Sequence, residues 1–381
     1  MKDFHFIYIF LVLSLSIACD KKQVLITEKL LAFFPNSENF NIFKYAQQVK
    51  NYTTLIYKLT DYALDNLIGK KVKKQIVDQN KLYNFSIILA KEYNSNSKGK
   101  INPYHNIFHA ADVIHTLYIY LSKSQKNNSI LFSDTYKKQV DELEIKSKIN
   151  YNDLDIFALI IAAACHDFRH PARDSNFYFN YKDKVPFSKI LKDYDYKLEY
   201  YHYAEAKKLI QEMGLLDLLN KFQKERFYKI MKLTIYGTDN SLNKQHSENL
   251  IKYKNIMNIN SNYLVNENIK DIDNIKLIMF ECFLHAADIS NPTKEKDYFI
   301  ELSDRINEEF CEQSKEAHSY DENVEINCFE KKDKKRLESN LSFFNNVFEV
   351  FYKPFCEVFP YLNYLCENYE DNKKYVLLTI G

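Results

Sequence analysis

An uninterrupted apolar run, Ile156–Cys165, constrains the fold of this chain more than any other feature. The run carries no charge and is long enough for about three turns of a helix that is buried on all sides. The polar pair His166–Asp167 follows it directly. An imidazole and a carboxylate at the end of a buried helix can point at one divalent ion, and the second carboxylate oxygen can reach another. The run therefore predicts a central helix that ends in a polar site.

The rest of the chain also favours helices. Apolar residues recur at helical spacing, for example at Ile56, Leu59, Ala63 and Leu67. Only five glycines and seven prolines occur among 381 residues, which disfavours a turn-rich β architecture. With 46% hydrophobic residues and no evident linker, the sequence predicts an all-α, compact multi-helix domain.

Two further stretches carry residues of the same chemistry. In Asn102–Leu117 we expect Pro103 in the first turn of a helix, with His105, His109 and Asp112 stacked on one face. Taken alone, this could be a helix with two incidental histidines. The stretch Phe283–Lys294 again ends an apolar run and places Asp288 before a Ser-Asn-Pro stop. Together the three stretches offer two histidines and two aspartates for a metal site.

In this order the three stretches resemble the catalytic domain of the class I cyclic nucleotide phosphodiesterases. That family carries YHNxxHAxDV, then HDxxHP, then a segment like HxADxSNPTK, and this chain has YHNIFHAADV, HDFRHP and HAADISNPTK. The resemblance extends from about Asn39 to about Tyr369. It implies an all-α domain with a buried two-metal site that hydrolyses a 3′,5′-cyclic nucleotide, cAMP or cGMP, to the nucleoside 5′-monophosphate.

The resemblance also implies roles for individual residues. A hydroxide held between Zn²⁺ at the first site and Mg²⁺ or Mn²⁺ at the second would attack the phosphate, and Asp167 would bridge the two ions. His105, oriented by Glu309, would protonate the leaving oxygen. The expected metal ligands are His109, His166, Asp167 and Asp288; the groups supporting them are His170, Glu199, His202 and Thr238; and the substrate-binding residues are Tyr104, Asn291, Asn340 and Phe343.

The chain departs from the family pattern at three places. The loop after His170-Pro171 is one residue longer and lacks the usual glycine, and Arg169 stands where aspartate is frequent. The purine-recognising glutamine is absent from the segment SNLSFF. One register puts Asn340 in its place and keeps Phe343 as the aromatic clamp, whereas a register anchored on Pro354 puts Phe344 there. Asparagine keeps the donor and acceptor of an amide on a shorter arm.

Two other functions fit part of the sequence. An HD-type metal phosphohydrolase acting on a non-cyclic nucleotide or phosphodiester would share the His-Asp pair and the late aspartate. It would not explain the upstream YHNxxHAADV stretch. A catalytically silent sensor of cyclic nucleotides would share the fold, and the intact set of metal ligands argues against it.

Charge, cysteines and the N-terminus bear on partners and location. The net charge is +1, so nucleic acid is not an expected partner. Seven cysteines without CxxC spacing predict reduced thiols in a cytosol-facing domain. The apolar segment Phe6–Ala18, followed by lysines, predicts a membrane anchor, with a cleaved signal and secretion as the alternative. The sequence leaves the oligomeric state open.

We therefore divide the chain into four segments. Residues 1–23 are the apolar N-terminal segment, 24–95 a helical layer of the catalytic domain, 96–370 the site-bearing helices of the same domain, and 371–381 a tail. Within them, Asn94–Gly99 is expected to be a turn and Ser122–Asn152 a polar surface insertion.

Overall fold

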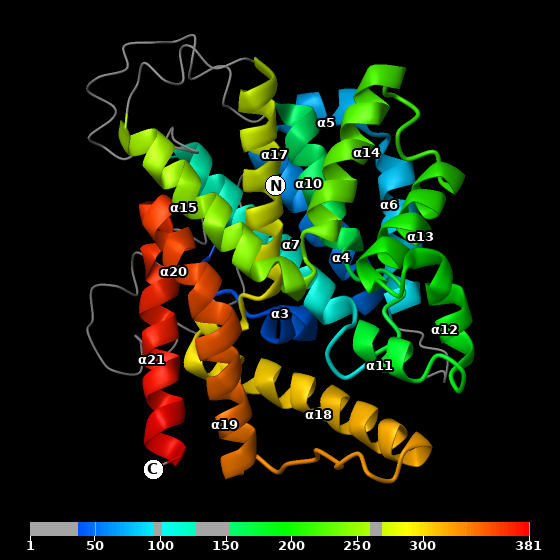
Figure 1. The fold of residues 1–381 in the computed structure, drawn as a ribbon. Coiled ribbons are helices and arrows are strands. Elements are labelled where there is room, and N and C mark those ends of the chain that lie inside the picture. Colours follow the sequence, from blue (N-terminus) through cyan, green and yellow to red (C-terminus); the bar gives the residue numbers. More distant parts are fainter. Residues whose placement is uncertain are drawn as a thin grey trace. The chain divides into compact units, whose positions relative to one another are not determined.

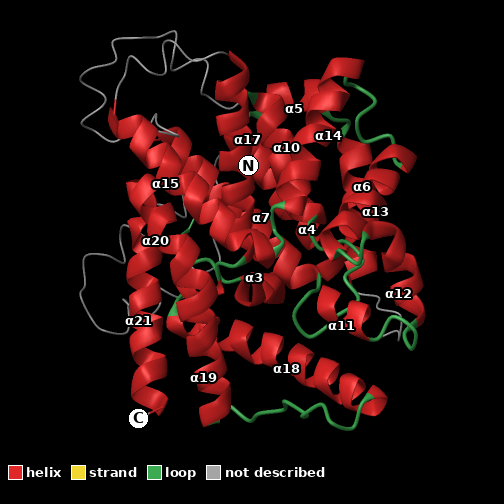
Figure 2. Cartoon of the chain, viewed as in Figure 1, coloured by secondary structure: helices red, strands yellow, loops and turns green. Residues whose placement is uncertain are grey.

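The computed structural model describes residues 37–49, 51–93, 101–126, 152–259, 269–331 and 333–380. These residues form helices, turns and loops, and no strand occurs among them (Figure 2). The all-α prediction is thus confirmed. The chain divides into two units, Met1–Lys50 and Asn51–Gly381. The described part of the first unit holds one helix, α3 (Ile42–Gln48), capped by the side chain of Asn41.

The second unit carries every site residue predicted above. The α-helices that the structure describes in it are α4 (Leu55–Leu67), α5 (Lys70–Ile76), α6 (Gln79–Tyr93), α7 (Ile107–Lys126), α10 (Asp153–Cys165), α11 (Ser175–Asn180), α12 (Pro186–Leu191), α13 (Leu198–Glu212), α14 (Lys221–Tyr236), α15 (Asn243–Ile259), α17 (Ile269–Asp288), α18 (Lys296–Tyr320), α19 (Lys334–Phe343), α20 (Glu349–Val358) and α21 (Asn363–Ile380). A π-helical segment, Phe344–Phe348, joins α19 to α20.

Helix α10 is the centre of the core, as its apolar sequence predicts. All its residues from Asp155 to Cys165 are buried, and it packs against α14, α7 and α4. Asn152 starts it, because its side chain accepts a hydrogen bond from the Asp155 amide at 2.8 Å. Since α14 also packs against α17, the C-terminal ends of α10 and α17 can face one cavity. In the view of Figure 1, α18 runs crosswise beneath these upright helices.

The start of α7 differs from the expectation. The helix begins at Ile107, so Pro103 and His105 lie in the preceding turn and not on its face. Asn106 sets this start, because its side chain accepts a hydrogen bond from the Phe108 amide at 2.8 Å. Asp112 is on the helix, but its carboxylate is bound by Tyr298 at 2.8 Å and Lys294 at 2.9 Å and does not join the metal-ligand set.

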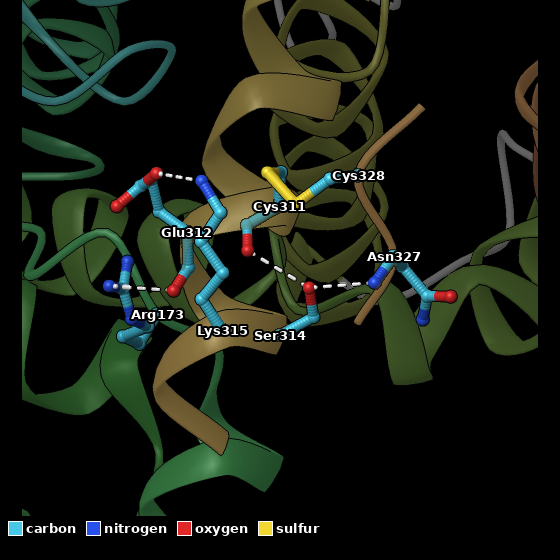
Figure 3. The surroundings of a disulfide bond; sticks show 7 residues. All are labelled: Arg173, Cys311, Glu312, Ser314, Lys315, Asn327 and Cys328. Carbon is cyan, nitrogen blue, oxygen red and sulfur yellow. Dashed lines mark hydrogen bonds and ion pairs between the residues drawn. A yellow bond between two sulfur atoms is a disulfide. The ribbon is translucent and has the colours of Figure 1, made fainter. Parts of the chain in front are cut away.

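The prediction of reduced cysteines is right for two residues and wrong for four. Cys165 and Cys282 are free, buried thiols. Disulfides join Cys311 to Cys328, shown in Figure 3, and Cys356 to Cys366. These pairs form because α18 and the loop after it, and α20 and α21, lie side by side, which cysteine spacing alone does not reveal. Disulfides are typical of oxidising compartments, so the cysteines no longer support a cytosolic location.

Several expectations fall outside the described residues. They are the anchor or signal at Phe6–Ala18, the turn at Asn94–Gly99 and residues 127–151 of the insertion. Residues 122–126, the first of the expected insertion, belong to α7. In the part of the chain that the structure describes, no helix combines the length and apolarity needed to span a bilayer. Residues 371–380, expected as a tail, form the second half of α21.

Candidate active site

A cavity of about 660 Å³ opens where α10, α13, α17 and α18 meet. Twelve of the fourteen predicted site residues line it. They are Tyr104, His105, Asp167, His170, Glu199, His202, Thr238, Asp288, Asn291, Glu309, Asn340 and Phe343. The other two, His109 and His166, are buried immediately beneath it, 3% and 0% exposed.

The four expected metal ligands converge at the floor of the cavity. His109 comes from α7, His166 and Asp167 directly follow α10, and Asp288 is the last residue of α17. Their ligand atoms all lie within 4.8 Å of one another. Asp288 Oδ1 is 3.0 Å from His109 Nε2 and 3.3 Å from His166 Nε2. Three helix segments distant in sequence therefore present two nitrogens and two carboxylates to one point.

The chemistry of this cluster fits a divalent cation. His166 Nδ1 donates to the Ala163 carbonyl at 2.9 Å, so in the neutral ring the lone pair is on Nε2 and faces the other ligands. His166 Nε2 and His109 Nε2 are only 3.2 Å apart. Burial works to raise the pKa of Asp288, but the neighbouring histidines hold it well below its usual range. The carboxylate therefore stays ionised, as a metal ligand must be.

A second group of unmet polar atoms lies beside Asp167. His202 Nε2 is buried without a hydrogen-bond partner among the described residues and lies 3.8 Å from Asp167 Oδ1. Glu199 Oε2 is buried and unpartnered in the same sense, and burial, followed by the charge of Asp239, raises the pKa of Glu199 to about 7. Thr238 donates to the Ile235 carbonyl and lines the cavity nearby. Such atoms suit a second cation that keeps several waters.

His105 is held by Glu309 from α18. Glu309 Oε1 contacts His105 Nδ1, while Oε2 accepts from the backbone amides of Tyr104 at 3.0 Å and His105 at 3.1 Å. Burial lowers the pKa of His105, yet the charges of Glu309 and Asp167 raise it to about 9. With this pKa the imidazole is cationic at neutral pH. Its Nε2 lies 4.0 Å from Asp167 Oδ2 and so points toward the ligand cluster.

Part of the cavity wall is formed by aromatic side chains and amides. The Asn291 amide donates to the Tyr104 hydroxyl at 2.8 Å. Asn340 and Phe343 also line the cavity, and so do Phe344 and Val347 of the π-helical segment. Both registers for the missing glutamine thus place residues in the cavity. Phe344 packs its ring near Phe299 and Tyr369.

Two residues that the sequence analysis did not single out support the site. The Tyr93 hydroxyl accepts from the Asp167 amide at 3.2 Å and donates to the Ala164 carbonyl at 3.1 Å. Arg173, 9% exposed, forms an ion pair with Glu316. Tyr93 lies within the segment that resembles the family, and Arg173 lies in the loop whose length departs from it. The resemblance around Tyr93 and the altered loop length at Arg173 are the sequence features that could have pointed to these two residues.

Comparisons with known proteins agree with this geometry. Residues 104–369 match the family described as 3′5′-cyclic nucleotide phosphodiesterase. The chain belongs to this family. Family membership implies the use of divalent metal ions. The cluster of His109, His166, Asp167 and Asp288 could hold one.

Individual relatives are more distant. The chain is 24% identical, over 88% of its length, to the probable 3′,5′-cyclic-AMP phosphodiesterase pde-4 of Caenorhabditis elegans and covers 44% of that protein. It is 31% identical, over 55% of its length, to the probable 3′,5′-cyclic phosphodiesterase pde-3 of the same organism and covers 30% of it. The chain thus spans less than half the length of these curated relatives.

The fold is also that of solved phosphodiesterase domains. The crystal structure of the phosphodiesterase domain of the RhoPDE fusion protein from the choanoflagellate Salpingoeca rosetta is similar to this chain with a TM-score of 0.68 and 18% identity. The similarity covers 92% of this chain and 95% of that one. At this identity it establishes the fold alone.

Proposed function

We propose that this chain hydrolyses a 3′,5′-cyclic nucleotide to the nucleoside 5′-monophosphate. The observation that carries the proposal is the position of His105, ion-paired with Glu309, beside the four-ligand cluster in one cavity. The cluster suits a phosphate and its activating metal, and His105 suits the departing oxygen. A metal site without the acid, or an acid without the metal site, would not support this reaction as well.

His109, His166, Asp167 and Asp288 are proposed to hold the first cation. Two nitrogens and two carboxylates within 4.8 Å suit zinc, which takes four ligands of these types. The oxygen-rich side of Asp167, with Glu199 and Thr238, suits magnesium or manganese. When bound, the two cations supply Lewis-acid activation of water and neutralise charge on the phosphate. His202, 3.8 Å from Asp167, is proposed to support that ligand, and His170 supports His105 by stacking on its ring.

His105 is proposed as the general acid. Glu309 accepts from Nδ1, so the remaining N–H is on Nε2, on the side of the ring that faces Asp167. With its pKa raised to about 9 by Glu309 and Asp167 against the effect of burial, the ring carries its proton at neutral pH. It can then protonate O3′ as the P–O3′ bond breaks, which typically contributes about 10²–10⁴-fold to the rate.

The purine is proposed to lie against Phe343 in the wall of the cavity. Asn291 and Asn340 offer amide donors and acceptors for its edge. The Asn291 side chain already donates to Tyr104, which fixes its orientation and leaves the carbonyl oxygen available to accept.

The test is an assay of purified protein with Zn²⁺ and Mg²⁺ on cAMP, cGMP and bis(p-nitrophenyl) phosphate, with identification of the product. Conversion of a cyclic nucleotide to the 5′-monophosphate supports the proposal. Turnover of the aryl diester alone would favour a phosphohydrolase of non-cyclic substrates. Binding of cyclic nucleotide by metal-loaded protein without any turnover would favour a silent sensor.

A further inference from the structure

The loop that follows His170 is clasped onto α18 by a buried arginine. Arg173 donates from Nη2 to Glu316 Oε2 at 2.8 Å and to the Glu312 carbonyl at 3.2 Å. Its Nε lies 3.2 Å from the same Glu316 oxygen, and Nη1 donates to the Ala172 carbonyl at 2.6 Å. Removing one partner of a buried, hydrogen-bonded ion pair leaves the other charge buried and unpaired, which is unfavourable. This contact therefore holds the loop against α18.

A reciprocal amide–carboxylate contact reinforces the clasp. The Asp174 amide donates to Gln313 Oε1 at 2.8 Å, and Gln313 Nε2 donates to Asp174 Oδ2 at 2.7 Å. Two successive loop residues therefore contact three residues of α18 within little more than one helical turn. The register between loop and helix is fixed as well as their separation.

The loop and α18 each contact His105, on different sides of the imidazole ring. Glu309, one turn before Gln313 on α18, binds His105 Nδ1. His170, at the start of the loop, stacks on the His105 ring with centroids 3.9 Å apart. A shift of the loop along α18 would move His170 relative to Glu309 and so disturb the imidazole between them.

The loop conformation requires such support. Ala172 has a φ of 60°, in the left-handed region that is unfavourable for a residue with a Cβ. Its amide donates to His170 Nδ1 at 3.1 Å, so the strained residue also sets the orientation of the stacked ring. Strain of this kind persists only where surrounding contacts over-determine the backbone.

The helix is held on its other side too. Figure 3 shows Arg173 at the Glu312 carbonyl and, across α18, the Cys311–Cys328 disulfide with Ser314, which accepts from the Asn327 amide at 2.9 Å. The segment Glu309–Glu316 is thereby attached on both sides, so it serves as a fixed reference for the loop.

We infer that Arg173 is a positioning residue for the reaction, which holds His170 and Glu309 in register around His105 through its contacts with Glu316 and Glu312. The inference rests on the proposed role of His105 as general acid. It assigns a function to the loop in which this chain departs from the pattern of its family, being one residue longer and without the glycine.

The first experiment compares Arg173→Ala with wild type on cAMP and on bis(p-nitrophenyl) phosphate. A misplaced acid matters for a poor leaving group and little for p-nitrophenolate. We expect kcat on the cyclic nucleotide to fall by roughly 10- to 100-fold with KM within about twofold, and turnover of the aryl diester to fall by less than about threefold. Zinc content, measured by atomic emission, should stay at the wild-type level.

The matched control is Lys315→Ala, which removes the surface ion pair with Glu312 on the same stretch of α18. It should leave both substrates unaffected. Arg173→Lys should lose nearly as much as alanine because an ammonium cannot make the paired guanidinium contacts. The exchange Arg173→Glu with Glu316→Arg should recover part of the cyclic-nucleotide rate.

Equal losses on both substrates, or loss of zinc, would overturn the inference in favour of a purely structural loop contact. An unchanged kcat on the cyclic nucleotide would overturn it as well. If Arg173→Ala does not fold, Glu316→Gln tests the same contact with a smaller change. Failure of the proposed function would be recognised separately, because wild type itself would then not hydrolyse the cyclic nucleotide.

Discussion

The imidazole rings of His105 and His170 are stacked, 3.9 Å between centroids, yet their pKa values are shifted in opposite directions. Burial and the positive charge of His105 hold the pKa of His170 well below its usual value. For His105 burial acts the same way, but Glu309 and Asp167 raise its pKa to about 9. Neighbouring titratable groups with separated pKa values mark acid and base assignments. Here the proton belongs to His105, the ring that Glu309 binds.

The His105→Asn substitution should keep the metal and lose the acid. His105 contributes no atom to the four-ligand cluster, so zinc content should be unchanged. Turnover of a cyclic nucleotide should fall by about two to four orders of magnitude, with much less loss on bis(p-nitrophenyl) phosphate. Steady-state kinetics on both substrates measure this. Equal loss on good and poor leaving groups would remove His105 from the acid role.

Removing one ligand of the cluster should abolish both turnover and zinc retention. Asp288→Ala and His166→Ala each delete one of four converging ligands, and the remaining three bind far more weakly. Metal analysis after dialysis is the measurement. His318→Gln is the control, since His318 contacts the Val324 carbonyl and lies outside the cluster. Full zinc content in either ligand variant would show that the assignment is wrong.

The Asn340 substitutions test how the purine is held. An unpaired buried polar edge costs roughly 1–3 kcal/mol, or about 5- to 150-fold in affinity. We expect Asn340→Gln to lower KM, Asn340→Ala to raise it, and neither to alter metal content. If alanine at 340 has no effect while Val347→Ala weakens binding, the register anchored on Pro354 is correct.

The buried carboxyl of Glu281 should make the free energy of unfolding depend on pH, independently of the site. Burial raises its pKa to about 7, so between about 4.5 and 7 the folded state holds a proton that the unfolded state has lost. Stability therefore falls as pH rises through this window and stays reduced above it. We expect Glu281→Gln to raise the free energy of unfolding at pH 8 by about 1–3 kcal/mol and by much less at pH 5.

Urea unfolding at the two pH values measures this effect. Glu357→Gln is a suitable control because that carboxylate is 58% exposed and pairs with Lys254 at the surface. A stability gain for Glu281→Gln that is equal at both pH values would contradict the linkage to ionisation.

The aspartate that is frequent at position 169 in the family should be slightly destabilising in this chain. Its guanidinium pairs with Glu92 at 2.8 Å and Glu205 at 2.5 Å. Arg169→Asp would place a third carboxylate there. Arg169→Asn is the matched control, since both residues tolerate the φ of 62° found here. We expect the free energy of unfolding of the aspartate variant, measured by urea unfolding, to be lower than that of the asparagine variant. The difference should be about 1 kcal/mol or less, because the pair is partly exposed and screened.

The location of the site was predictable because its residues stand at helix ends that local patterns mark. The apolar run before His166 and the Ser-Asn-Pro stop after Asp288 define where α10 and α17 end, and both ends prove to face one cavity. The spacing of polar and apolar residues along one segment is enough to place such points.

Contacts between segments distant in sequence could not be predicted from local patterns. The Glu309–His105 contact was expected only through the family resemblance, since 204 residues separate the two and no local periodicity links them. Helix α7 begins at Ile107 and not around Pro103, because the Asn106 side chain caps it there. The cysteine pairs and the purine register depend on how neighbouring helices and loops lie against each other.

By itself the sequence determined the all-α class, the helix ends that carry the ligands and the chemistry those ligands share, because these depend on residues near one another along the chain. Only the tertiary structure placed His105 in the turn before α7, where it contacts Glu309, attached the loop at Arg173 to α18, and paired four cysteines. These depend on the packing of helices against one another, where side-chain shape and burial select among many contacts that the local pattern permits equally.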